Sequence, residues 1–247
     1  MLRFMKTQMI LTALITGLLL ICSCNQNEPE TSNEPVLNEN DNAGQSVEIL
    51  YMGQGSLRVV TETDKVIYID PYAGEYTLAA DLILVTHEHF DHNAIERVKD
   101  RQPDCRIIRS RDAIIDGNHQ TFELGYVRVE AVEAGFNRYH DVQNCVGYVL
   151  TFKNGQKVYV SGDTSITDQM SEMSKMKIDY AFLCTDGVYN MGNEEAVRAA
   201  EMIGARYNIP YHNSTTGNGE MFSIDAAEHF AAPNKVIVRP GETITIE

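Results

Sequence analysis

Apolar and polar residues alternate along several short stretches of this chain, and a period of two is typical of half-buried strands. The alternation predicts strands at Val47–Met52, Leu57–Thr61, Val127–Val132, Gly147–Phe152 and Lys157–Val160. The continuous apolar run within Asp81–Thr86 predicts a further strand that is buried on both faces. These segments together predict a domain in which sheets supply most of the core.

Helical spacing of apolar residues appears between and after these stretches. It predicts helices at Asn93–Arg101, Asp168–Lys175, Glu194–Ile203 and Ser223–Phe230. Pro103 is expected to end the first of them. Gly53-Gln54-Gly55 predicts a hairpin turn and not a nucleotide-binding loop, because no spaced third glycine opens a helix. The mixture predicts one α/β domain of about 200 residues with a single core.

The first residues have the composition of a bacterial secretion signal. Arg3 and Lys6 precede an apolar run, Met9–Ile21, that is too short for a comfortable membrane span. Ser23 before Cys24 resembles a lipobox, and this resemblance implies cleavage after Ser23 and lipidation of Cys24. An uncleaved anchor helix is the alternative. We therefore expect a lipid-anchored protein of the bacterial cell envelope, on its periplasmic face or at the cell surface.

The segment after Cys24 is unlike the rest of the chain. Asn25–Gly44 contains two prolines, five acidic residues, no basic residue and almost no apolar one. Such a segment cannot bury enough surface to offset the entropy lost on ordering, so it predicts a flexible acidic tether. The expected organisation is a signal peptide at residues 1–23, the tether at residues 24–44 and the folded domain at residues 45–247.

Charge and cysteine content restrict the partners. The formal net charge is −15, and loss of Arg3 and Lys6 with the signal takes it to −17. This charge repels nucleic acid and anionic lipid, so the expected partners are a small-molecule substrate and a membrane held only through the lipid. Cys105, Cys145 and Cys184 lack metal-motif spacing and predict small core residues. The oligomeric state does not follow from the sequence.

The densest chemistry lies in Thr86–His92, directly after the predicted buried strand. His87 and His89 are two residues apart, so they point to the same side of an extended chain. Asp91 and His92 follow as the backbone turns, and they can face a second point a few ångströms away. Imidazole and carboxylate groups are good ligands for zinc and related ions. The spacing suits two adjacent metals better than one, whereas a structural polar loop is the simpler alternative.

Further donors are needed, because each metal requires about three or four protein ligands. His140, Asp163 and His212 each follow or join a predicted strand, as expected of a site built at one edge of a sheet system. His119 is the alternative to His140, but it lies in a predicted exposed turn. His229 falls within a predicted helix and is expected to be a surface residue.

The order of these motifs resembles that of the metallo-β-lactamase superfamily: HEHFDH comes first, then His140, then SGDT with Asp163, and finally IPYHN with His212. The wider sequence, over nearly all of Val47–Glu247, resembles the L-ascorbate-6-phosphate lactonase-like branch of this superfamily. The resemblance implies a four-layer αββα sandwich of two similar halves. It also implies two divalent ions, zinc by preference, with manganese or iron as alternatives. The first ion would be held by His87, His89 and His140, the second by Asp91, His92 and His212, with Asp163 bridging them.

The resemblance also implies roles for other residues. Asp70 would support the metal loop from behind, although a turn residue before proline is an equal alternative. Tyr189, Asn190 and Met191 would line the substrate pocket, and Asp91 would also pass a proton during catalysis. The expected activity is hydrolysis of a lactone or ester by metal-bound hydroxide. The alternatives are a phosphodiesterase or phosphatase acting on a phosphorylated small molecule or lipid head group, and a non-catalytic binding lipoprotein of the envelope.

Overall fold

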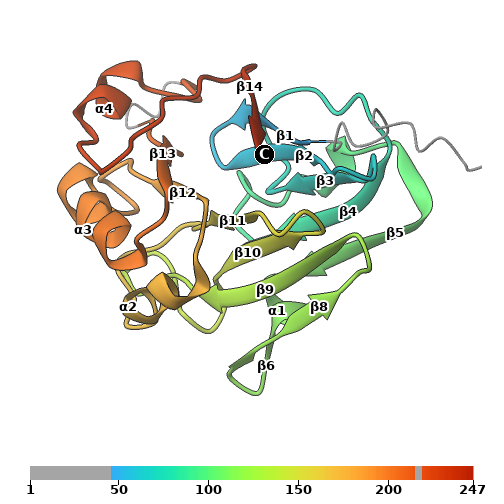
Figure 1. Cartoon of the computed structure of the whole chain (residues 1–247), viewed down its shortest axis with the longest axis horizontal. Helices are drawn as coiled ribbons and strands as arrows, with labels where there is room; N and C mark the ends of the chain where they lie inside the picture. The colour runs from blue at the N-terminus through green and yellow to red at the C-terminus, as the bar shows by residue number, and fades with distance from the viewer. Residues whose placement is uncertain (1–45, 215–218, 247) are drawn as a thin grey trace, which may run out of the picture. The chain divides into compact units, whose positions relative to one another are not determined.

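A computed structural model describes residues 46–214 and 219–246. The predicted signal peptide, lipidation site and tether lie outside these residues. Within the described part, two six-stranded sheets pack face to face (Figure 1). None of the helices among the described residues is long and apolar enough to cross a membrane.

The first sheet has the strand order β14-β1-β2-β3-β4-β5. Its strands are β1 (Val47–Gly53), β2 (Ser56–Val60), β3 (Val66–Ile69), β4 (Ala80–Val85), β5 (Arg101–Arg109) and β14 (Thr243–Ile246). β1, β2 and β3 form an antiparallel meander, after which β4 and β5 continue the sheet in parallel.

The second sheet has the order β13-β12-β11-β10-β9-β8. Its strands are β8 (Thr121–Glu123), β9 (Val127–Glu133), β10 (Val146–Phe152), β11 (Lys157–Val160), β12 (Tyr180–Cys184) and β13 (Tyr207–Tyr211). From β9 to β13 the pairing is again antiparallel, antiparallel, parallel and parallel. The two halves therefore repeat one strand topology, as the sequence resemblance implied.

The main core lies between the two sheets. It contains alternate residues of both, such as Ile49 and Leu84 from the first and Val129 and Leu150 from the second. A smaller cluster, with Tyr68 and others, covers the outer face of the first sheet. Cys145 and Cys184 are buried and unpaired, which agrees with their predicted role as small core residues.

Helices cover the outer faces unevenly. The helices are α1 (Ser110–Ala113), α2 (Met170–Met173), α3 (Asn193–Ile203) and α4 (Ile224–His229), with 3₁₀ turns η1 (Ile95–Arg97) and η2 (Ser174–Met176). α3 packs on β12 and buries its alanine-rich face, which includes Ala196 and Ala200. The αββα architecture is confirmed, although the helical layer over the first sheet is thin.

The prediction of a helix over Asn93–Arg101 is wrong except for a single turn. Only η1 forms there, and Arg101 already belongs to β5. Ile95 lies against the outer cluster and Val98 is part of it, so a single turn covers this face. Pro103 lies inside β5 and does not end a helix, because β5 is an edge strand on which a missing N–H is tolerated.

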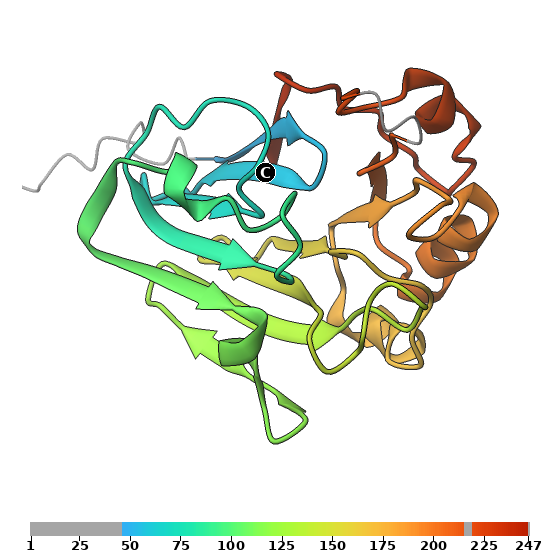
Figure 2. The same ribbon diagram turned by 180° about the vertical axis from the view of Figure 1, so that it is seen from behind.

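A small hairpin projects from the second half. β6 (Ile114–Ile115) and β7 (Asn118–His119) pair across Asp116 and Gly117, which both have positive φ angles. The hairpin projects at the bottom of both Figure 1 and Figure 2. His119 lies in β7, a strand where the sequence predicted an exposed turn.

Candidate metal centre and substrate cavity

Each candidate donor lies beyond the carboxyl end of a strand. His87 to His92 follow β4, Asp163 follows β11, and His212 follows β13 directly. His140 lies in the turn after β9, which is parallel to β11 because both are antiparallel to β10. The carboxyl ends of such strands meet at one edge, where α/β proteins commonly bind ligands. The topology therefore gathers donors that are far apart in the sequence.

The two oxygens of Asp163 divide the imidazoles into two groups. Oδ2 lies 3.2 Å from His140 Nε2 and 3.9 Å from His87 Nε2. Oδ1 lies 3.3 Å from His92 Nε2 and 3.4 Å from His212 Nε2. One carboxylate thus faces a pair of ring nitrogens on each side, which is the arrangement expected of a bridging ligand between two ions.

Each group gains one more donor. The His89 ring is centred 4.5 Å from that of His87 and 4.9 Å from that of His140. Asp91 Oδ2 lies 3.7 Å from His212 Nε2 and 3.9 Å from His92 Nε2. In both trios the potential ligand atoms lie within 4.8 Å of one another. The structure therefore brings together all seven donors named from the sequence.

The donor atoms at the centre have few protein partners. His87 Nε2, His92 Nε2 and Asp163 Oδ1 are buried without a hydrogen-bond partner within the described part of the chain. Buried polar atoms are normally paired, so a convergence of unpaired ones requires a reason. Imidazole nitrogen and carboxylate oxygen are donors that zinc-type ions accept. The residues present therefore fit a pair of divalent metal ions.

The electrostatics of the cluster favour a cation. Burial lowers the pKa of His87 well below its ordinary value, and His92 lowers it further. Burial also opposes charge on His92, but the carboxylates of Asp163 and Asp70 outweigh it and raise this pKa to about 10. Burial acts to raise the pKa of Asp163, yet His212 and His92 hold it well below its ordinary value. The buried carboxylates thus stabilise positive charge at the centre.

Asp70 holds His92 from behind, as the resemblance implied. Its Oδ2 lies 2.7 Å from His92 Nδ1, and its two oxygens accept hydrogen bonds from the backbone N–H and hydroxyl of Thr86. Both Asp70 and His92 have fully buried side chains. A partner on Nδ1 fixes the ring orientation and directs Nε2 at the metal centre.

Two other rings have polar side chains behind them that sequence reasoning missed, a hydrogen-bond partner for His140 and an ion-pair contact for His212. Asn137 Oδ1 lies 3.1 Å from His140 Nδ1, and Asp186 Oδ2 lies 3.5 Å from His212 Nδ1. Asp186 follows β12 directly, so its place after a parallel strand was the available signal. Asn137 lies in an irregular turn, for which the sequence offered no such signal.

Gln54 is a further missed residue. It lies in the β1–β2 turn with a φ of 51°, and its Nε2 donates to Asp91 Oδ2 at 3.1 Å. The same nitrogen lies 3.1 Å from His212 Nε2. The next residue, Gly55, has to be glycine because the turn backbone approaches the His92 ring closely. A Cβ at this position would lie 2.7 Å from His92 Cε1. The hairpin turn was predicted, but its contact with the donors was not.

A cavity of about 820 Å³ opens over the donors. Tyr189 lines it, as predicted from the resemblance. Asn190 and Met191 do not line it, and this part of the prediction needs correction. Met191 is fully buried in the core, and Asn190 is drawn inward by a hydrogen bond from its Nδ2 to Asp186 Oδ2 at 2.6 Å.

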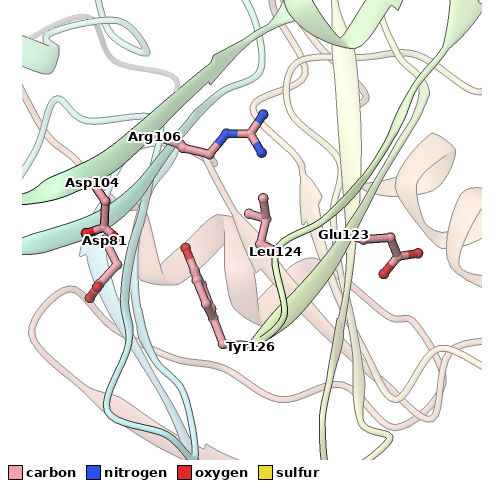
Figure 3. Close-up of a pocket in the computed structure, with 6 residues that line it drawn as sticks. All are labelled: Asp81, Asp104, Arg106, Glu123, Leu124 and Tyr126. Atoms are coloured by element: carbon pink, nitrogen blue, oxygen red, sulfur yellow. The ribbon is translucent and has the colours of Figure 1, made fainter.

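A second cavity, of about 250 Å³, lies away from the donors beside β4, β5 and β8. Figure 3 shows its lining side chains, with the Glu123 carboxylate pointing away from the others. Asp81, at its edge, forms an ion pair with Lys65 at 2.8 Å and accepts the backbone N–H of Val66 at 2.9 Å. No imidazole lines this cavity, and its buried carboxylate already has partners, so the larger cavity is the candidate site of chemistry.

Comparison with known proteins agrees with this geometry. A family model described as a β-lactamase superfamily domain matches residues 48–212. A UPF0173 metal-dependent hydrolase of Thermodesulfovibrio yellowstonii is 26% identical, over 82% of this chain and 93% of its own. Another, from Methanoregula boonei, is 31% identical over 76% of this chain and 93% of its own.

Solved structures share the fold. A crystal structure from Parabacteroides distasonis is 30% identical with a TM-score of 0.62, and the match covers 79% of this chain and 94% of that one. Igni18, a metallo hydrolase of Ignicoccus hospitalis, has a TM-score of 0.65 at 21% identity, over 82% of this chain and 99% of its own. The chain belongs to the metallo-β-lactamase superfamily. Its class is that of the metal-dependent hydrolases.

Proposed function

We propose that this hydrolase uses two divalent metal ions, zinc by preference, to cleave a lactone or small ester. The observation that carries the proposal is the position of Asp163, whose two oxygens each face a separate group of imidazoles. His87, His89 and His140 would hold one ion, and Asp91, His92 and His212 the other. A donor set rich in imidazole supports zinc over manganese or magnesium.

The chain's own groups have distinct tasks. When bound, a pair of such ions activates water near neutral pH and polarises the substrate oxygen. Asp70 and Asn137 keep the rings of His92 and His140 oriented, and Asp186 lies 3.5 Å from His212 Nδ1. Asp91 is the more accessible carboxylate of the cluster, with a side chain 18% exposed against 5% for Asp163. Asp91 is therefore the carboxylate best placed to pass the released proton to solvent. Burial acts to raise its pKa, but His212 and His92 hold it below its ordinary value, so Asp91 would relay the proton and not retain it.

The cavity composition supports a lactone or ester over a phosphate ester. None of the described residues that line the cavity is lysine or arginine. A phosphoryl group normally needs such cations, or helix N-termini, to offset its charge as the transition state forms. Arg138 is not among the lining residues, although its guanidinium lies 4.5 Å from the centre of the ring of Tyr139, which is. The L-ascorbate-6-phosphate lactonase-like resemblance supports the same choice.

A substrate panel tests this proposal. Protein loaded with zinc or with manganese is assayed on lactones, alkyl esters, phosphomonoesters and phosphodiesters. We expect turnover of lactones or esters that disappears in His87→Ala and in Asp163→Asn. Phosphodiester turnover without lactone or ester turnover would replace the proposal with the phosphodiesterase alternative. Full metal loading with no turnover of any class would favour a binding protein.

We further propose that the mature chain begins at lipidated Cys24 and acts in the bacterial cell envelope, tethered by residues 24–44. The support is the sequence of the first residues, with Arg3, Lys6, Met9–Ile21 and Ser23 preceding the cysteine. Cys24→Ser is expected to abolish lipidation and shift the protein out of the membrane fraction. An intact mass that retains Met1 and shows an unmodified Cys24 would contradict this proposal.

A further inference from the structure

Two pairs of aromatic side chains line the cavity above the donors, and neither pair belongs to the metal cluster. Tyr72 and Phe90 come from loops that follow β3 and β4 in the first half. Tyr139 and Tyr189 come from loops that follow β9 and β12 in the second half. Each half of the fold therefore supplies one pair to the wall of the same cavity.

Both pairs are preorganised by edge-to-face packing. The Tyr72 and Phe90 rings are 5.8 Å apart at 85°, and the Tyr139 and Tyr189 rings are 5.0 Å apart at 67°. Such geometry stabilises a pair beyond the area that it buries. Phe90 is nevertheless 78% exposed and Tyr189 is 55% exposed. Exposed apolar rings beside a reactive centre offer surface that a ligand can cover.

The cavity is also larger than the metal chemistry requires. Its volume of about 820 Å³ falls in the range of pockets that enclose drug-sized ligands, ~300–1,000 Å³. A bare lactone ring would leave most of the aromatic wall uncovered. Among the described residues that line the cavity there is no lysine or arginine to pair with an anionic substituent. The part of the cavity that remains after the reacting group is placed is therefore mainly aromatic and apolar, with Ser214 and Glu220 among its polar members.

We infer that the substrate is an uncharged lactone or ester that carries an alkyl or aryl substituent, and that this substituent binds between the Tyr72–Phe90 and Tyr139–Tyr189 pairs. The inference rests on the proposed function for the reacting group. Phe90 and Tyr189 are then specificity-determining residues, because they are the most exposed member of each pair. They contact the substituent and not the bond that breaks.

The kinetic test uses γ-lactones whose alkyl side chain lengthens by one methylene at a time. Complete burial of a methylene is worth about 0.8 kcal/mol, so kcat/KM is expected to rise about fourfold per methylene until the cavity is filled. Phe90→Ala and Tyr189→Ala should reduce this increment to below about twofold, measured for each variant against its own kcat/KM for the unsubstituted lactone. Ile115→Ala removes an exposed apolar side chain from the β6–β7 hairpin and is the matched control.

An isosteric pair of esters tests the charge of the substituent. Choline acetate and 3,3-dimethylbutyl acetate have the same shape, but only the first carries a positive charge. An aromatic wall can also bind cations through the ring faces. We expect a preference for the uncharged ester. A preference for the choline ester would overturn the inference, and so would a flat dependence on chain length in the wild-type protein.

A binding measurement separates this inference from the proposed reaction. The chain contains no tryptophan, so Tyr189→Trp places a single reporter in the cavity wall. The variant is titrated with γ-lactams of increasing side-chain length, which resemble lactones but resist hydrolysis, and its tryptophan fluorescence is recorded. Ile115→Trp is the control. The inference is supported if longer lactams bind more tightly in the Tyr189→Trp titration while the Ile115→Trp signal does not respond. This holds even if no lactone is turned over. Lactone turnover without this dependence overturns the inference and leaves the proposed function standing.

Discussion

His92 Nδ1 lies 2.7 Å from Asp70 Oδ2, and both side chains are completely buried. Asp70 follows β3 in the first half, as Asp163 follows β11 in the second. These two strands occupy equivalent places in the repeated topology. One half therefore supplies a carboxylate that orients a ligand, and the other supplies a carboxylate that faces the metal centre itself.

Asp70→Asn is expected to weaken binding of the second metal ion by about 10- to 100-fold, because the amide nitrogen cannot accept the hydrogen bonds of His92 and Thr86. Metal affinity is measured by competition with a chromophoric chelator. Asp81→Asn is the matched control, since Asp81 is also a buried carboxylate with an ion pair and a backbone N–H partner. Asp81→Asn should lower stability without changing metal affinity. Equal metal affinity in Asp70→Asn and wild type would show that Asp70 is only a turn residue.

Removal of metal is expected to destabilise the fold. Purified and reconstituted protein should contain about two transition-metal ions per chain. His212→Ala should retain about one ion, because only the second group loses a donor. Elemental analysis gives the ion content, and thermal unfolding with and without chelator gives the stability. A reconstituted wild-type sample with no metal would contradict the assignment of all seven donors.

Gly55→Ala tests the close approach of the β1–β2 turn to the metal centre. The added Cβ would lie 2.7 Å from His92 Cε1, so the ring or the turn must shift. We expect the variant to fold but to lose the second ion and most of its activity. Gly192→Ala is the control, because a Cβ there meets nothing closer than 3.6 Å. Unchanged metal content in Gly55→Ala would indicate that the turn moves without disturbing His92.

Asp91→Asn is expected to lower kcat by at least ~100-fold, since it alters both a metal ligand and the group that passes the proton. Tyr189→Phe keeps the aromatic ring in the cavity wall and should change kcat by no more than about twofold. Steady-state kinetics on the best substrate of the panel measures both variants. Similar losses in the two variants would remove Asp91 from its proposed role in proton transfer.

The sequence indicated which imidazoles and carboxylates would converge, because the signal for them is local. HEHFDH concentrates four donors on one loop after a buried strand, Asp163 lies three residues beyond the end of β11, and His212 follows β13 directly. The end of a strand is a strong constraint on position, since parallel neighbours bring their carboxyl ends to one edge. The same rule, applied to β12, would also have indicated Asp186.

Positions that depend on loop conformation were predicted poorly. Tyr189, Asn190 and Met191 are consecutive, yet only Tyr189 reaches the cavity. The reason is Asp186, whose Oδ1 accepts the backbone N–H groups of Val188 and Tyr189 at 2.7 Å each and so winds the loop. Such a turn sets side-chain directions through contacts that periodicity does not encode. Gln54 was missed for a similar reason, because its role comes from the packing of a hairpin turn against another segment.

The donors are distributed over turns from both sheets, and His87 and His212 are separated by more than half of the chain. Under the proposed assignment, no partly synthesised or half-folded chain holds the complete cluster, so full metal loading would follow formation of both sheets. The identity of the ions would then depend on the metal supply where folding is completed and not where the chain is synthesised. Protein folded in a different compartment would carry different metals on an identical fold.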